Sequence, residues 1–230
     1  MKYLVVTRAD SNIESYTKVT LPIIESYSKE WEADFRILSH TPSIMTEDEK
    51  THYRILEVQQ LLDEYDRILC LDLDMIITKN CPNPFDEVPF DCVGTIYEDK
   101  GSRQQDRKKH IHNIQQHWSN VGWVSGYTNA GTFMLSNIHK NIFEPVNGEY
   151  YKGWGSVDVH LAYNIHKYNF KVHELSYKWN HMTMFSEGWN GSPNRFDSYI
   201  IHYAGHGIFD RNINSKVNQI HSDYKTIYNQ

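Results

Sequence analysis

Two aspartates separated by one residue stand out as groups that could do chemistry. Asp72 and Asp74 follow the near-continuous apolar run 67–71. Side chains alternate between the two sides of a strand, so both carboxylates are expected to point the same way. Neighbouring anions are costly unless a proton or a cation neutralises them, and Mg²⁺ or Mn²⁺ binds carboxylate oxygens while keeping positions for phosphate oxygens. The pair therefore predicts a metal site, the alternative being two acids on an exposed strand end.

The segments around this pair follow the order of an α/β fold. We expect strands at 3–7, 34–38, 67–71, 91–97, 132–135, 171–174 and 199–203, and helices at 13–31 (interrupted near Pro22), 47–64 and 156–167. The polar segment 98–120 is interpreted as a helix or a mobile loop over the site. The pattern predicts one domain with a mixed, mainly parallel central sheet, in which ligands bind beyond the carboxyl ends of the strands.

Composition excludes several classes of protein. The 230 residues carry a net charge of −6, which argues against a nucleic-acid binder. The three cysteines form no disulfide framework, and they favour a reducing compartment. No stretch resembles a signal peptide or reaches transmembrane length, so we expect a soluble, cytoplasmic protein. Nothing in the sequence indicates the oligomeric state.

Segment 65–74 resembles the metal-binding strand of the retaining GT-A glycosyltransferases of the glycogenin and bacterial galactosyltransferase type, family 8. The resemblance implies a Rossmann-like nucleotide-binding GT-A fold. It implies that Asp72 and Asp74 bind a cation, usually Mn²⁺ and otherwise Mg²⁺, which bridges the donor diphosphate, and that Leu73 contacts the donor. Residues 1–100 would form the nucleotide- and metal-binding half, and residues 101–230 the acceptor- and sugar-binding half.

Two upstream segments extend the resemblance. Segment 7–10 is similar to the family's first loop, which implies that Thr7 and Asp10 contact the nucleoside. Asp10 suits a helix N-cap equally well. Segment 53–56 is similar to the family's Arg-bearing helix, so Arg54 is a candidate contact to the donor sugar or phosphate through its guanidinium fork. The alternative for Arg54 is a surface salt bridge with Glu57 or Asp48.

Two downstream segments contribute candidate catalytic residues. Asn129 opens a segment that looks like the family's Asn-Ala-Gly, and its amide suits sugar hydroxyls, although a plain turn is the alternative. Asp158 matches only the first Asp of the family's Asp-Gln-Asp, since Val159 and His160 follow it. The resemblance implies that Asp158 binds donor sugar hydroxyls or stabilises positive charge at the anomeric carbon. The alternative is an acid favoured by the helix dipole.

The last matching segment is 200–205, which resembles the family's His-x-x-Gly signature. It implies that His202 completes the metal site, with Gly205 near the donor, and imidazole suits Mn²⁺ better than Mg²⁺. A structural histidine is the alternative. The family usually continues to Lys-Pro-Trp, where the lysine holds the diphosphate. No lysine stands at 206–211 here, so His206 and Arg211 are the candidates for that charge.

The resulting prediction is a metal-dependent transferase that moves a sugar from a nucleotide sugar, UDP-linked by resemblance, to an acceptor hydroxyl with retention. The acceptor would be a carbohydrate, a lipid-linked molecule or a protein. Two alternatives stay open. An Asp-x-Asp after an apolar strand also begins haloacid-dehalogenase-like phosphatases, which need a later lysine and an acidic loop. The incomplete Asp-Gln-Asp and Lys-Pro-Trp motifs also suit a non-catalytic carbohydrate-binding protein on a transferase fold.

Overall fold

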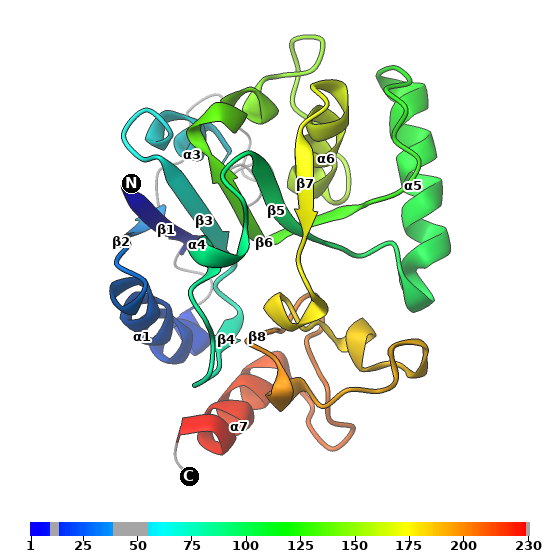
Figure 1. Cartoon of the computed structure of the whole chain (residues 1–230). Helices are drawn as coiled ribbons and strands as arrows, with labels where there is room; N and C mark the ends of the chain where they lie inside the picture. The colour runs from blue at the N-terminus through cyan, green and yellow to red at the C-terminus, as the bar shows by residue number, and fades with distance from the viewer. Residues whose placement is uncertain (10–13, 39–54, 229–230) are drawn as a thin grey trace.

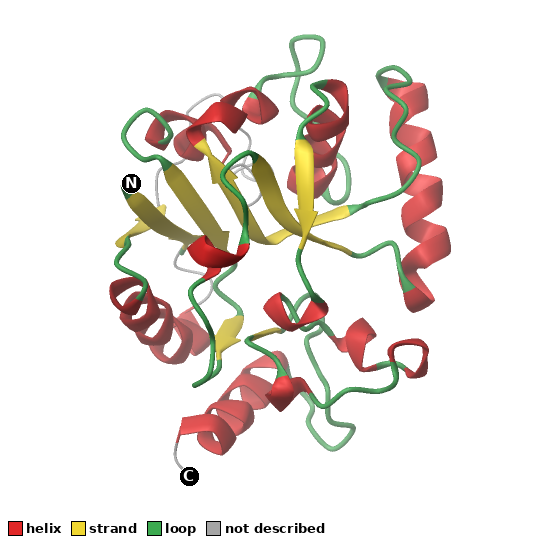
Figure 2. Ribbon diagram, viewed as in Figure 1, coloured by secondary structure: helices red, strands yellow, loops and turns green. Residues whose placement is uncertain are grey.

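A six-stranded sheet forms the centre of the computed structural model, which describes residues 1–9, 14–38 and 55–228 (Figures 1 and 2). Its strand order is β2-β1-β3-β6-β5-β7. The bounds are β1 (Tyr3–Arg8), β2 (Asp34–Leu38), β3 (Arg67–Leu71), β5 (Cys92–Tyr97), β6 (Thr128–Ser136) and β7 (Lys171–Glu174). Only β6 runs antiparallel to its neighbours, β3 and β5. The mixed, mainly parallel sheet expected from the sequence is confirmed.

Helices cover both faces of this sheet. The α-helices of the described residues are α1 (Glu14–Glu30), α3 (Ile55–Leu61), α4 (Pro84–Glu87), α5 (Gln104–His117), α6 (Ser156–Lys167) and α7 (Lys216–Tyr228). In the view of Figure 1, α3 and α6 lie above the sheet, and α1 and α7 lie below it. None of the helices in the described part of the chain is long and apolar enough to cross a membrane.

The alternation of buried residues along the strands explains this three-layer arrangement. On β3, Leu69 and Leu71 pack with α1, whereas Ile68 and Cys70 pack with α3 and α6. Successive side chains of a strand point to opposite faces, so a strand with helices on both sides is buried on both faces and mostly apolar. This is why the run 67–71 is buried at every position.

A second, two-stranded sheet lies against the first. β4 (Met75–Ile77) pairs antiparallel with β8 (Ile200–His202), with Met75 opposite His202. The strand expected at 199–203 therefore exists, but it joins β4 and not the central sheet. β4 itself was not predicted, because three apolar residues carry too little pattern to identify a strand.

Other expected elements form with shifted bounds. The helix expected at 13–31 is α1, which continues through Pro22. Of the helix expected at 47–64, α3 covers 55–61, and residues 47–54 lie outside the described residues. The strand expected at 132–135 extends over 128–136. The polar segment 98–120 contains helix α5, which packs through Ile111 and Ile114 against α6.

Candidate active site

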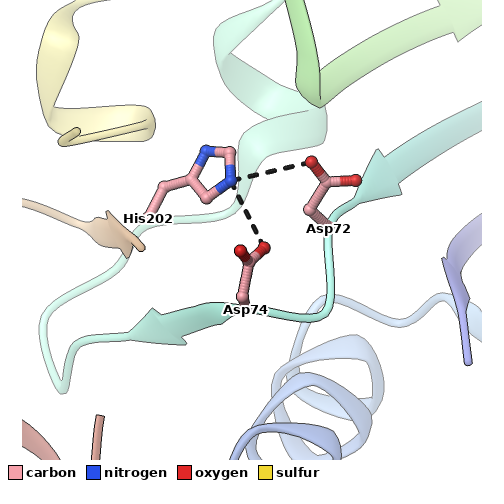
Figure 3. Close-up of side chains that lie close together, drawn as sticks. All are labelled: Asp72, Asp74 and His202. Atoms are coloured by element: carbon pink, nitrogen blue, oxygen red, sulfur yellow. Dashed lines mark ion pairs between the residues drawn. The ribbon is translucent and has the colours of Figure 1, made fainter. Parts of the chain in front are cut away.

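Three side chains from two distant parts of the chain converge beyond the carboxyl end of β3: Asp72, Asp74 and His202 (Figure 3). The Nε2 atom of His202 lies 3.6 Å from Oδ2 of Asp72 and 3.3 Å from Oδ1 of Asp74. One possible ligand atom from each residue lies within 4.8 Å of the others. The structure thus brings together the three residues that the sequence predicted as metal ligands.

Backbone pairing fixes the positions of these residues. Asp72 directly follows β3 and donates its N–H to the carbonyl of Gly131 at 2.8 Å. Asp74 directly precedes β4, and its carbonyl accepts the N–H of Tyr203 at 2.9 Å. The pairing of β4 with β8 therefore sets His202 beside Asp74, across a sequence separation that no local pattern could bridge.

An irregularity in β6 shapes the floor of the site. Thr95 of β5 pairs with Phe133, and the next residue, Ile96, pairs with Asn129. Residues 130–132 of β6 therefore have no partner on β5, as in a β-bulge. A Cβ atom placed on Gly131 would lie 2.6 Å from Cε1 of His202 and 2.9 Å from Oδ2 of Asp72. Only glycine leaves room there for the cluster.

Two asparagines fix which nitrogen of His202 faces the carboxylates. Oδ1 of Asn129 accepts the backbone N–H of Gly131 at 3.0 Å, so this atom is an oxygen. Nδ2 of Asn180 donates to that oxygen at 2.9 Å, which leaves Oδ1 of Asn180 facing Nδ1 of His202 at 2.7 Å. Nδ1 must then carry a proton, and Nε2 has a lone pair for a cation once His202 is neutral.

The asparagine chain ends at a buried acid. Nδ2 of Asn129 donates to Glu98, whose side chain is buried and ion-paired with both Arg103 and Arg107. Two guanidinium groups compensate for the burial of this carboxylate. A continuous set of contacts therefore runs from the region of α5 through Glu98, Asn129 and Asn180 to His202.

Opposite charges stabilise each other within the cluster. Burial alone would raise the pKa of Asp74, but His202 and Lys216 outweigh it and hold this pKa well below its usual range. Burial alone would lower the pKa of His202, but Asp74 and Asp72 outweigh it and raise this pKa. Nζ of Lys216 lies 2.8 Å from Oδ2 of Asp74. Without a metal ion, protonated His202 and Lys216 supply the positive charge that the two aspartates require.

The carboxyl group of Asp158 differs from that of Asp74 because its pKa is raised and not lowered. It lies in the first turn of α6, and its Oδ1 accepts the N–H of Ala130 at 2.7 Å. Burial, followed by the nearby carboxylate of Glu98, raises the pKa of Asp158 to about 7, and Asp72 adds to the rise. Asp158 is thus close enough to the cluster to sense its charge.

The other predicted site residues differ in burial, and two of them lie outside the described residues. Thr7 is buried near the carboxyl end of strand β1, and its hydroxyl has no hydrogen-bond partner among the described residues. The side chain of Leu73 is buried in the core. Gly205 is exposed with a φ of +65°, which favours glycine. Asp10 and Arg54 lie outside the described residues.

Three residues around the site were not assigned roles from the sequence, although Asn180 ends a segment, 175–180, that resembles the family's strand exit. Asn180 and Glu98 act through contacts with residues distant in the chain, and Lys216 lies in α7, beyond the segments that suggested the site. His206 and Arg211, the candidates for the missing positive charge, are exposed, whereas Lys216 contacts Asp74. A lysine at the start of an amphipathic C-terminal helix gives no local signal for such a role.

The cluster fits a divalent cation. The two carboxylates are hard ligands, and the imidazole is a borderline ligand. This set suits Mn²⁺ better than Mg²⁺, which prefers oxygen ligands alone. The fixed tautomer of His202 and the space left by Gly131 both serve such an ion. The same arrangement would leave room on the ion for phosphate oxygens.

Comparisons with known proteins agree with this geometry. A family model described as Glycosyl transferase family 8 matches residues 3–207. No curated protein sequence matches the chain. Among solved structures, a glycosyltransferase involved in the glycosylation of the major capsid of PBCV-1 matches with a TM-score of 0.62 and 13% identity, covering 99% of this chain and 100% of that one.

Two further structures share the fold. The galactosyltransferase LgtC, in complex with donor and acceptor sugar analogs, matches with a TM-score of 0.57 and 17% identity, over 98% of this chain and 96% of that one. Mouse xyloside xylosyltransferase 1 matches with a TM-score of 0.54 and 12% identity, over 91% and 99% of the two chains. At these identities the structures support the GT-A fold.

Proposed function

The chain belongs to glycosyl transferase family 8 and is a glycosyltransferase, and on that premise we propose that it transfers a sugar from a UDP-linked donor to an acceptor hydroxyl with retention. The convergence of Asp72, Asp74 and His202 carries the metal-dependent part of this proposal. The family match favours a transferase over the phosphatase and over the non-catalytic carbohydrate-binding protein. The acceptor would be a carbohydrate, a lipid-linked molecule or a protein.

In this proposal Asp72, Asp74 and His202 would hold Mn²⁺, which would bind the donor diphosphate. When bound, the ion stabilises the negative charge that develops on the leaving diphosphate. Asn180 orients His202, and Asn129 orients Asn180. Asn129 is buried and its Oδ1 already accepts two hydrogen bonds, so we assign it a positioning role in addition to the sugar contact suggested by the sequence.

Asp158 is proposed to contact the transferred sugar. Its carboxyl group is half-buried, lies near Asp72 and has a raised pKa. In its neutral form it can donate a hydrogen bond to a sugar hydroxyl, and in its ionised form it can stabilise positive charge at the anomeric carbon. For the retention that the family resemblance implies, we propose a front-face route that the leaving phosphate assists.

The nucleoside is proposed to bind at the carboxyl end of β1. The buried hydroxyl of Thr7, without a hydrogen-bond partner among the described residues, supports this position because buried polar groups normally have a partner. UDP is assigned by the family resemblance. Residues 1–100 would supply the nucleotide and most metal contacts, with His202 contributed by the acceptor-binding half.

Calorimetry with Mn²⁺ and a panel of UDP, GDP and dTDP tests the donor and the metal together. We expect UDP to bind in the presence of Mn²⁺, and the variant D72N/D74N to bind neither the ion nor the nucleotide. Absence of nucleotide binding to the unmodified protein would refute the donor assignment. Turnover of UDP-sugars then identifies the sugar, and NMR of the anomeric proton of the product decides between retention and inversion.

A further inference from the structure

Lys216 adds a positive charge to the cluster from outside the segment that matches the family model. It is the first residue of α7, whereas the match to the family model ends at residue 207. Its Nζ atom pairs with Oδ2 of Asp74 at 2.8 Å, while His202 faces the other oxygen, Oδ1, at 3.3 Å. Both oxygens of Asp74 are therefore already engaged by positive groups before any metal ion binds.

The backbone of Lys216 is held in place by the rest of α7. Ile220 of α7 is fully buried in the core. Asp223, which is also buried, accepts hydrogen bonds from Tyr203 at 2.9 Å and from Nε of Arg195 at 2.8 Å. Tyr203 directly follows the metal ligand His202. The helix start is thus anchored to the same part of the chain as the metal site.

The side chain of Lys216 can nevertheless move. It is 24% exposed, and its ammonium group is carried on a flexible four-carbon stem. Changes in its side-chain torsions can shift Nζ by several ångströms while α7 stays in place. A fixed backbone with a movable charge suits a group that exchanges one anionic partner for another.

We propose that Lys216 is an exchangeable counter-ion of this site, an inference that rests on the proposed metal and diphosphate binding. While no metal ion is present, its ammonium group neutralises Asp74. When a divalent cation takes Asp74, the two positive charges repel each other and the ammonium group leaves the carboxylate. The donor diphosphate, which arrives beside the cation, offers Lys216 its next anionic partner.

This exchange predicts two opposite effects of removing the charge. In K216M, Mn²⁺ no longer competes with an ammonium group for Asp74, so Mn²⁺ alone should bind more tightly. The diphosphate loses a charge-assisted contact, so UDP should bind more weakly in saturating Mn²⁺. A lysine that only stabilised α7 would not produce a gain in one affinity and a loss in the other.

The test measures both affinities by calorimetry in the 230-residue chain at low ionic strength. For K216M we expect Mn²⁺ affinity to rise about fivefold or more, the lower end of typical coupling between two ligands. We expect UDP affinity in saturating Mn²⁺ to fall about 10- to 100-fold, as for loss of a hydrogen bond between charged groups. K225M, on the exposed face of the last turn of α7, is the matched control and should change neither.

The conservative variant K216R keeps a positive charge near Asp74 and should retain the competition with Mn²⁺. Unchanged or weaker Mn²⁺ binding in K216M would overturn the proposal, and so would unchanged UDP binding. If the unmodified protein binds Mn²⁺ but not UDP, the donor assignment fails, and the Mn²⁺ affinity of K216M still decides whether Lys216 competes for Asp74. If no variant binds Mn²⁺, the metal site and this proposal both fail.

Discussion

Replacing Asn180 with alanine tests whether the asparagine chain sets up the metal ligand His202. Asn180 is fully buried, and its amide joins Nδ1 of His202 at 2.7 Å to Oδ1 of Asn129 at 2.9 Å. In N180A the imidazole loses the acceptor that holds its proton on Nδ1. Nothing then favours the tautomer that presents the Nε2 lone pair to a cation.

The expected loss follows from these contacts. Removing the partner that orients a metal-binding histidine typically costs about 10- to 100-fold in metal affinity, which corresponds to about 1.4–2.7 kcal/mol. The variant also leaves the Nδ1–H group buried without an acceptor, so the free energy of unfolding should fall by about 1–3 kcal/mol. Asn129 keeps the hydrogen bond from Gly131 and should hold its position.

Calorimetric titration with Mn²⁺ measures the first effect, and urea unfolding monitored by tryptophan fluorescence measures the second. N164A is the control, because Asn164 is equally buried and donates to the carbonyls of Ile142 and Glu144, away from the cluster. It should lose stability and keep its Mn²⁺ affinity. Normal Mn²⁺ binding by N180A, or an equal loss in N164A, would refute the idea that Asn180 acts by orienting His202.

Three further outcomes test other parts of the site. G131A should abolish Mn²⁺ binding, because its Cβ would lie 2.6 Å from Cε1 of His202; an affinity like that of the unmodified protein would show that the cluster tolerates a methyl group. Asp158 has a pKa raised to about 7, so the folded state keeps a proton that the unfolded chain releases, and this contribution to stability is lost as pH rises from about 4 to about 7. D158N cannot titrate, so its Tm relative to the unmodified protein should rise between about pH 5 and about pH 8 without metal ion, and a constant difference would contradict the raised pKa. R195M leaves the buried carboxylate of Asp223 without its cation, and chemical unfolding should show a loss of about 3–5 kcal/mol; a change within the scatter of repeated measurements would show that Tyr203 and neighbouring donors suffice.

The secondary structure predicted from the sequence was most accurate where burial and local pattern agree. The run 67–71 is nearly all apolar because helices cover both faces of the sheet, and it is β3 with the predicted bounds. The expected elements 156–167 and 171–174 are also observed with the predicted bounds as α6 and β7. In each case the periodicity of the apolar side chains and the local propensity of the residues predict the same element.

The pairing of strands that are distant in the chain could not be predicted from the sequence. Ile200 to His202 read as a strand, but no local feature shows that its partner is β4 and not the central sheet. The same limit applies to the site: Asp72 and Asp74 were found from their spacing, whereas Asn180 and Lys216 were not assigned roles. Their contacts depend on how the last third of the chain packs under the sheet, which only the three-dimensional structure shows.

The pairing of β4 with β8 has a consequence for folding. The third ligand arrives on a strand that can join only after the chain has closed a loop of more than a hundred residues, which is entropically demanding and slow. A nascent or truncated chain that stops before β8 could form all six strands of the main sheet and still lack His202. Tight cation binding would therefore report that the C-terminal part has docked, and by mass action the ion would stabilise that last-assembled region.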